Sequence, residues 1–299
     1  MEQNNIKHKK HTLLSDFKEI TKFGLSISVM ISSVAGYLLG ADLSKIDYKI
    51  LFLLIVGGYC MVGASNIYNQ IIEIEPDKIM KRTMNRPLPA GRMKKQHAFY
   101  LAVLLTVIGL VALYAINPKT ALFGAISIFL YVSAYTPMKP VSPISVFVGA
   151  FPGAIPFMLG WVAATNHFGI EAGMLFLIQF LWQFPHFWAI GWLQFEEYKK
   201  AGFNMMPTME KNKKASMLII MYTVFMILAS LLPVLRITGQ LYLTPVGAVL
   251  VLLSGLLMLY YAVQLHKNQD DRTARKLMLS SVLYITLIQI IFVVDKFLH

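Results

Sequence analysis

Long apolar runs separated by short polar segments dominate the chain. Nine of these runs come close to the roughly 20 residues that a helix needs to cross the hydrocarbon core of a bilayer. The pattern therefore predicts an all-α integral membrane protein with nine transmembrane helices. The predicted spans lie near 22–41, 49–69, 97–116, 119–136, 142–164, 171–193, 215–235, 241–264 and 276–295.

The composition supports a lipid-facing surface. Hydrophobic residues make up 57% of the 299 positions and charged residues only 14%, against roughly 25% in ordinary soluble domains. Residues 1–21 are expected to form a cytoplasmic N-terminal segment, and residues 22–295 a single polytopic domain. The one cysteine, Cys60, excludes an intramolecular disulfide.

The net charge of +12 follows the membrane topology rather than a nucleic-acid surface. If the N-terminus is inside, 22 of the 27 Lys and Arg residues fall in inside segments, as the positive-inside rule requires. The C-terminus is then outside, and no nucleic-acid partner is expected. The five basic residues left for the outer side are Lys45, Lys49, Lys119, Arg236 and Lys296.

One polar stretch, residues 69–92, carries the densest chemistry. Asn69, Glu73 and Asp77 are spaced by four, which puts their side chains on one helical face, and Lys81 continues the row. An amide oxygen and two carboxylates are hard ligands suited to Mg²⁺, which keeps several waters and shares substrate phosphate oxygens. The row therefore predicts a site for a metal and a phosphorylated ligand.

The same stretch contains a second pair of charges and a helix breaker. Arg82 and Arg86 are also four apart and could grip a diphosphate with directed hydrogen bonds. Pro76 disfavours helical geometry at Glu75, so the helix is expected to kink or end there, and Asp77 could belong to a helix or to a turn. The simpler alternative is a solvated inside loop whose cations only fix the topology.

A second cluster ends the sixth span. His186 lies within this span, where an ionisable side chain is costly and functional by default, although a hydrogen-bonded packing role is the alternative. Glu196 and Glu197 follow at the inside mouth, or simply end a helix. Four spans separate this loop from the first one, so both lie on the inside and could meet at one cavity. Lys139, alone in a short inside loop, is a plausible third cation.

These motifs resemble a known family. N-x-x-x-E-x-x-x-D followed by KRTMNRPLPAGR is similar to the first signature of the UbiA superfamily of intramembrane prenyltransferases. Glu73 stands where most members have Asp. Together with YTPMK, GAFPGAIPFMLGW and WQFPHFW, it resembles the branch of the superfamily that farnesylates haem b. His186 and Glu196 or Glu197 occupy the region where members that prenylate aromatic acids carry a second Asp-rich motif.

The resemblance implies a nine-helix UbiA-type bundle whose central cavity is capped by two inside loops, in the cell membrane of a prokaryote. It implies Mg²⁺ as cofactor and haem b and farnesyl diphosphate as substrates. The product would be haem O for terminal oxidases, and a haem A synthase is a candidate recipient. His186 would face the haem, as an iron ligand or beside the reacting vinyl group. The implied catalytic residues are His186, Asp77 and Glu73; the diphosphate-binding residues are Lys81, Arg82, Arg86 and Lys139; and the metal-binding residues are Asn69, Glu73, Asp77, Glu196 and Glu197.

Two other functions are compatible with parts of the pattern. The nearer one is a UbiA-type enzyme that prenylates an aromatic quinone precursor. The more distant one is an anion transporter that uses the arginine pair for selectivity, but transport does not require the row of carboxylates beside the cations.

Overall fold

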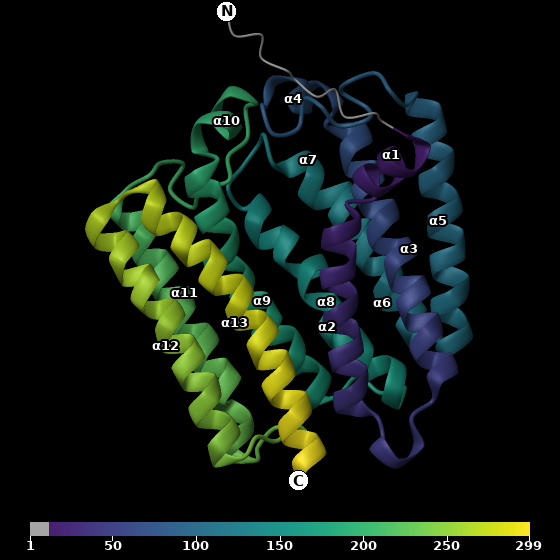
Figure 1. Cartoon of the computed structure of the whole chain (residues 1–299), viewed down its shortest axis with the longest axis vertical. Coiled ribbons are helices and arrows are strands. Elements are labelled where there is room, and N and C mark those ends of the chain that lie inside the picture. The colour runs from purple at the N-terminus through teal and green to yellow at the C-terminus, as the bar shows by residue number, and fades with distance from the viewer. Residues whose placement is uncertain (1–11) are drawn as a thin grey trace, which may run out of the picture.

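The computed structural model describes residues 12–299, and all regular secondary structure in this range is helical (Figure 1). The elements are α1 (Leu13–Ile20), α2 (Phe23–Gly40), η1 (Leu43–Lys45), α3 (Tyr48–Ile72), α4 (Ile74–Ile79), α5 (Lys95–Ile116), α6 (Pro118–Phe129), the π-helical turn η2 (Leu130–Tyr135), α7 (Thr136–Met138), α8 (Ser145–Thr165), α9 (Ile170–Leu193), α10 (Phe195–Lys200), α11 (Lys213–Leu231), η3 (Leu232–Leu235), α12 (Pro245–Asn268) and α13 (Asp271–Leu298).

The predicted all-α membrane architecture is confirmed. Eight helical segments of the described chain are long and apolar enough to cross a bilayer, and each coincides with one of the predicted runs. The remaining run, 171–193, coincides with α9, which has 24 residues. Helix α9 carries Gln179, Gln183 and His186 and is not among these eight segments, so the count of nine spans depends on this helix.

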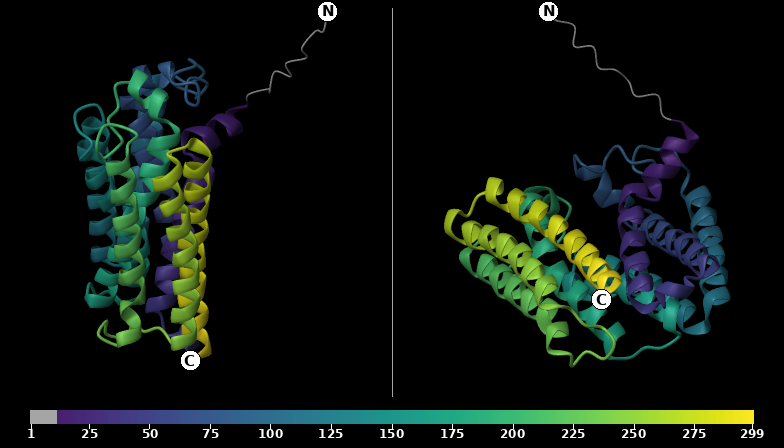
Figure 2. Two further views of the ribbon diagram at one scale, coloured as in Figure 1. Left: turned by 90° about the vertical axis from the view of Figure 1, so that its left-hand side faces the viewer. Right: turned by 60° about the horizontal axis from the view of Figure 1, so that its bottom comes forward.

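The helices form an elongated bundle whose long members run side by side (Figure 2). Helix α8 packs against α2, α6 and α9, and it has the largest buried share of the eight spans, 67%. Two glycines allow the α2–α8 contact, since a Cβ atom on Gly160 would lie 1.9 Å from the Ser33 carbonyl oxygen and one on Gly36 2.0 Å from the Phe157 carbonyl oxygen. On the other side of the bundle, α9 packs against α11 and α13.

Two long helices end in the same way at the end of the bundle opposite the C-terminus. Helix α3 stops at Glu73 (φ −98°, ψ 20°) and is followed by the six-residue α4, while α9 stops at Gln194 (φ −101°, ψ 15°) and is followed by the six-residue α10. Both short helices lie at this end, together with α7 (Figure 1). The two halves of the chain therefore share the same arrangement, a long helix followed by a short one, although their sequences show no clear repeat.

Candidate functional site

Asn69, Glu73 and Asp77 keep their helical spacing across the junction between α3 and α4. The Glu73 N–H donates to the Asn69 carbonyl at 2.9 Å, and the Asp77 N–H donates to the Glu73 carbonyl at 2.8 Å, so the helical spacing continues through the junction. Pro76 is the third residue of α4, where a backbone N–H normally has no partner within its helix. Asp77 therefore lies on a helix, and the kink falls at Glu73.

Asp77 forms a buried ion pair with Arg86. The Arg86 Nη1 atom lies 2.8 Å from Asp77 Oδ2, and the side chains are 14% and 1% exposed. The second oxygen of the carboxylate, Oδ1, is buried and has no hydrogen-bond partner within residues 12–299. A buried carboxylate oxygen without a partner is costly, so this atom points to a ligand.

Glu73 forms a second buried ion pair, with Lys139. The Lys139 ammonium lies 2.7 Å from Glu73 Oε1, 4.7 Å from the centre of the Tyr135 ring and 5.6 Å from that of Phe203. Burial acts to lower the pKa of Lys139, but the Glu73 carboxylate together with Tyr131 and Tyr198 outweighs burial, and the pKa is raised. Lys139 is therefore a cation at neutral pH, as the sequence prediction requires.

A π-helical turn brings the third member of the row into contact with the Lys139 segment. The Asn69 amide nitrogen donates to Thr136 Oγ1 at 3.3 Å, and this hydroxyl donates to the Tyr131 carbonyl at 2.8 Å. Pro137 follows at once, and π-helical turns of this kind are frequent at functional sites. The contact fixes the Asn69 side chain and does not use its amide oxygen.

The donor set fits a magnesium ion that is shared with a substrate. Within residues 12–299, no group of three or more His, Cys, Asp or Glu side chains comes together as a complete metal site. The row instead supplies two carboxylates and one amide, including the unpartnered oxygen of Asp77. Mg²⁺ commonly takes one or two carboxylates and completes its shell with water and phosphate oxygens.

The loops that follow α3 and α9 meet, as the even number of intervening spans predicts. Glu197 Oε2 accepts a hydrogen bond from the Lys81 N–H at 2.7 Å, and Oε1 lies 3.3 Å from the Lys200 ammonium. The bond from the Lys81 backbone is the main cause of the lowered pKa of Glu197. Glu196 is exposed, so Glu197 is the residue of this pair that contacts the first loop.

Not every predicted residue lies at the centre of the site. The chain leaves the helical path after Ile79 and forms successive turns, so Arg82 and Arg86 do not share a helical face. The side chains of Lys81 and Arg82 are exposed, whereas that of Arg86 is drawn inward by Asp77.

His186 occupies a separate position deeper in the bundle. It lies eight residues before Gln194, about 12 Å along α9 at 1.5 Å per residue. Its Nδ1 atom is 2.7 Å from Ser281 Oγ of α13, and its ring stacks on Trp182 at 4.6 Å between centroids. The Ser281 hydroxyl donates to the Met278 carbonyl at 2.6 Å, so it accepts from Nδ1–H and leaves Nε2 with a free lone pair.

Lys22 is a half-buried residue near the charges of Glu73 and Asp77, whereas the sequence pattern predicts only that it contributes to the positive charge of the N-terminal segment. It precedes the spanning helix α2, is half-buried and adopts a left-handed conformation with φ of 48°. Burial, then the nearby Arg86 and Lys139 cations, lower its pKa to about 7, while Glu73 and Asp77 act in the opposite direction. Its only sequence signal is a lysine directly before an apolar run.

Known proteins share both the sequence and the fold. The model of the UbiA prenyltransferase family matches residues 29–288. The chain is 62% identical to a protoheme IX farnesyltransferase of Flavobacterium psychrophilum over 289 residues, which cover 96% of each protein. It is 60% identical to the enzyme of the same name from Christiangramia forsetii over 299 residues, covering 100% of this chain and 99% of the relative.

Solved structures show the same fold at lower identity. A digeranylgeranylglyceryl phosphate synthase superposes with a TM-score of 0.77 at 24% identity, covering 94% of this chain and 98% of the other. A UbiA homologue from Archaeoglobus fulgidus, solved with GPP and Mg²⁺, gives a TM-score of 0.71 at 14% identity, with 93% and 99% coverage. The chain belongs to the UbiA prenyltransferase family and, within it, to the protoheme IX farnesyltransferases.

Proposed function

We propose that this protein transfers the farnesyl group of farnesyl diphosphate to a vinyl group of haem b and so produces haem O. The observation that carries the proposal is the pair of buried ion pairs, Glu73–Lys139 and Asp77–Arg86, on one helical row at the inside end of the bundle. The high identity to relatives named for this reaction supports the choice of substrates.

The carboxylates and the cations of this site would change partners when the substrate binds. Asn69, Glu73 and Asp77 would hold Mg²⁺, which supplies positive charge for the diphosphate leaving group. Arg86 and Lys139, released from their carboxylates, would then bind diphosphate oxygens. Glu197 supports the site by holding the backbone of the first loop at Lys81, and the exposed Lys81 and Arg82 would attract the anionic substrate from the inside.

The reaction exchanges one bond of the farnesyl group for another. The bond between farnesyl C1 and the diphosphate oxygen breaks, and the vinyl electron pair forms a carbon–carbon bond to C1. Water adds to the resulting cation next to the porphyrin and loses a proton, which gives a hydroxyethylfarnesyl side chain and free diphosphate. Charge neutralisation at the site favours the first step, and the apolar bundle limits premature capture of the farnesyl group by water.

His186 is the residue proposed to face the haem. Its Nε2 lone pair suits an iron ligand or an acceptor near the reacting vinyl group, and Ser281 and Trp182 fix the ring. Because His186 lies well along α9 from the inside end, a haem bound at His186 would be separated from a diphosphate bound at that end. The farnesyl chain could then lie between the two.

The proposal includes an orientation in the membrane. The positive-inside rule places the diphosphate site and the N-terminus on the cytoplasmic side of a prokaryotic cell membrane and the C-terminus outside. Transfer of haem O to a haem A synthase rests on the family resemblance alone.

A reconstitution assay tests this function. Purified protein in liposomes is given Mg²⁺, farnesyl diphosphate and haem b, and the haems are identified by mass spectrometry. We expect haem O with haem b as acceptor and no product after chelation of Mg²⁺. A parallel reaction offers aromatic acids and other prenyl diphosphates, and a prenylated aromatic acid as the sole product would refute the haem assignment.

A further inference from the structure

An apolar groove lies between α2 and α3 on the outer surface of the bundle. Its walls run from Phe23 to Val34 on α2 and from Ile55 to Cys60 on α3, and no lining residue in the described part of the chain is charged. Gly36, which packs against α8, lies on the opposite face of α2. The groove has a volume of about 510 Å³, within the roughly 300–1,000 Å³ of sites that hold small apolar molecules.

The groove has the depth of one leaflet of a bilayer. Phe23 lies at the inside end of α2, and Val34 follows eleven residues later, about 16 Å along the helix. The hydrocarbon core is about 30 Å thick, so one leaflet contributes about 15 Å. Ile27 and Ile31 are 42% and 52% exposed, which leaves the groove open to the membrane. One acyl chain of the inside leaflet therefore fits it.

A lysine stands at the inside end of this groove. The Lys18 ammonium lies 5.6 Å from the centre of the Phe23 ring, which lines the groove. Lys18 is exposed and forms no ion pair within residues 12–299. Helix α2 begins at Phe23 without a side-chain cap, and the free N–H groups of a helix N-terminus add to the attraction for phosphate. The charge at this end of the groove therefore suits an anionic headgroup.

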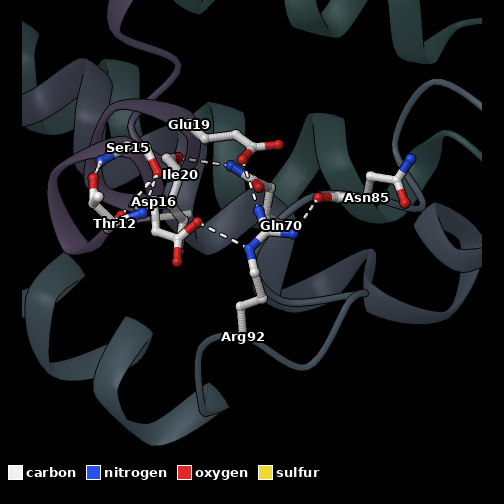
Figure 3. A network of polar contacts seen from close by, with 8 residues as sticks. All are labelled: Thr12, Ser15, Asp16, Glu19, Ile20, Gln70, Asn85 and Arg92. Carbon is white, nitrogen blue, oxygen red and sulfur yellow. Dashed lines mark hydrogen bonds and ion pairs between the residues drawn. The ribbon is translucent and has the colours of Figure 1, made fainter. Parts of the chain in front are cut away.

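The acidic residues of α1 do not offset this charge. Arg92 Nε lies 2.9 Å from Asp16 Oδ1, and Nη2 lies 2.7 Å from Glu19 Oε2 (Figure 3). Leu14 and Lys18, four residues apart, share another face of α1 and are exposed. An exposed leucine beside a lysine is typical of a helix that lies in the membrane interface, and α1 projects sideways from the bundle (Figure 2).

Helix α1 is held in a fixed position relative to the groove. The Gln70 amide nitrogen donates to the Ile20 carbonyl at 2.7 Å (Figure 3). The hydroxyl groups of Tyr59 and Thr21 lie 3.1 Å apart, within hydrogen-bond distance. Because Tyr59 also lines the groove, the turn that follows α1 is bonded to the wall of the groove itself.

We propose that the groove binds one phospholipid with an acidic headgroup, whose acyl chain lies between α2 and α3 and whose headgroup meets Lys18. This site is separate from the row of Asn69, Glu73 and Asp77, and it does not depend on the proposed reaction. The lipid would hold α1 from the side of the membrane, while Arg92 holds it from the side of the bundle.

Native mass spectrometry of the full-length protein in detergent, titrated with phosphatidylglycerol or phosphatidylcholine, tests the headgroup assignment. The first phosphatidylglycerol should bind about fivefold more tightly than the first phosphatidylcholine, which is the contribution of one lysine near an acidic lipid surface. Lys18→Gln should remove this preference. The matched control is Lys95→Gln, exposed at the start of α5, which should keep it. An equal preference in the two variants would overturn the headgroup assignment.

Filling the groove tests the position of the acyl chain. Ile31→Trp on α2 and Ile55→Trp on α3 each place a large ring in the groove and should weaken binding of the first lipid of either kind at least about tenfold, because the chain loses its buried contacts. Leu253→Trp, at an exposed position on α12, is the matched control and should have no effect. Thermal unfolding identifies any variant that is not folded, and the two groove variants can replace each other.

Two results would contradict the proposed lipid site. Unchanged lipid binding in a folded Ile31→Trp or Ile55→Trp variant would show that the chain does not occupy the groove. A dimer of the native protein that these substitutions dissociate would show that a second copy of the chain fills it. Either result would leave the proposed haem reaction as it stands.

Discussion

Replacing Asp77 with asparagine separates the two contributions of this residue, to stability and to turnover. The Asp77 and Arg86 side chains are 1% and 14% exposed, so the change leaves a buried guanidinium without its counter-charge. Removing one partner of a buried pair costs about 3–5 kcal/mol. Because asparagine keeps the shape and an acceptor oxygen, we expect the low end of this range, about 3 kcal/mol.

The effect on catalysis should be larger than the effect on folding. Asp77→Asn removes a carboxylate proposed to hold the metal, and metal-assisted charge neutralisation is worth several kcal/mol of barrier. Haem O formation should therefore fall at least about a hundredfold, while the protein still inserts into the membrane, since Asp77 lies outside the spanning helices.

The assay combines haem O formation in liposomes with thermal unfolding in detergent. A loss of about 3 kcal/mol corresponds to a melting temperature lowered by roughly 6–12 °C. Glu75→Gln is the control, because Glu75 is 77% exposed and pairs only with Lys78 among the described residues; it should change neither quantity. Near-normal turnover in Asp77→Asn would contradict the proposed role of Asp77 in metal binding, and a melting temperature equal to that of the control would contradict the stabilising role of its ion pair with Arg86.

Further predictions concern packing, haem binding and pH. Gly160→Ala should destabilise the α2–α8 contact by about 1–3 kcal/mol in chemical denaturation, whereas Gly173→Ala, with no atom within 4 Å of the added Cβ, should not. His186→Phe should weaken haem b binding, measured by absorbance titration, without changing pyrophosphate affinity; unchanged haem binding would exclude His186 from the haem site. The pKa of Glu197 is lowered, mainly by the hydrogen bond from the Lys81 N–H. This hydrogen bond is therefore intact when the pH is above the ordinary pKa of a glutamate, and it is lost as the pH falls through the lowered pKa of Glu197. Hydrogen exchange at the Lys81 amide should therefore stay protected down to below pH 4.5 and lose protection at neutral pH in Glu197→Gln.

The sequence was a good guide wherever a feature depends on local periodicity. Apolar runs of spanning length must become helices, because a bilayer leaves backbone groups no other partners. The spacing of Asn69, Glu73 and Asp77 likewise predicted a shared face. Spacing alone could not show whether Asp77 lies on a helix or on a turn after Pro76, because the answer depends on where the next helix begins. Since α4 begins directly after Glu73, Pro76 falls in its first turn and costs no hydrogen bond.

Features that depend on tertiary contacts were not predictable. The interval between Arg82 and Arg86 suggested a helical pair, but the chain after Ile79 forms turns that draw only Arg86 inward to Asp77. The partial burial of Lys22 was not predictable either, because the residues that surround it come from segments distant in the sequence. Both cases depend on contacts between distant segments rather than on spacing within one helix.

The most direct test of the proposed function is mass spectrometry of haems extracted from cells that express this chain and lack any other haem-farnesylating activity. We expect haem O in cells with the native protein and only haem b in cells with Asp77→Asn. Absence of haem O in cells that contain the folded native protein in their membranes would contradict the proposed function.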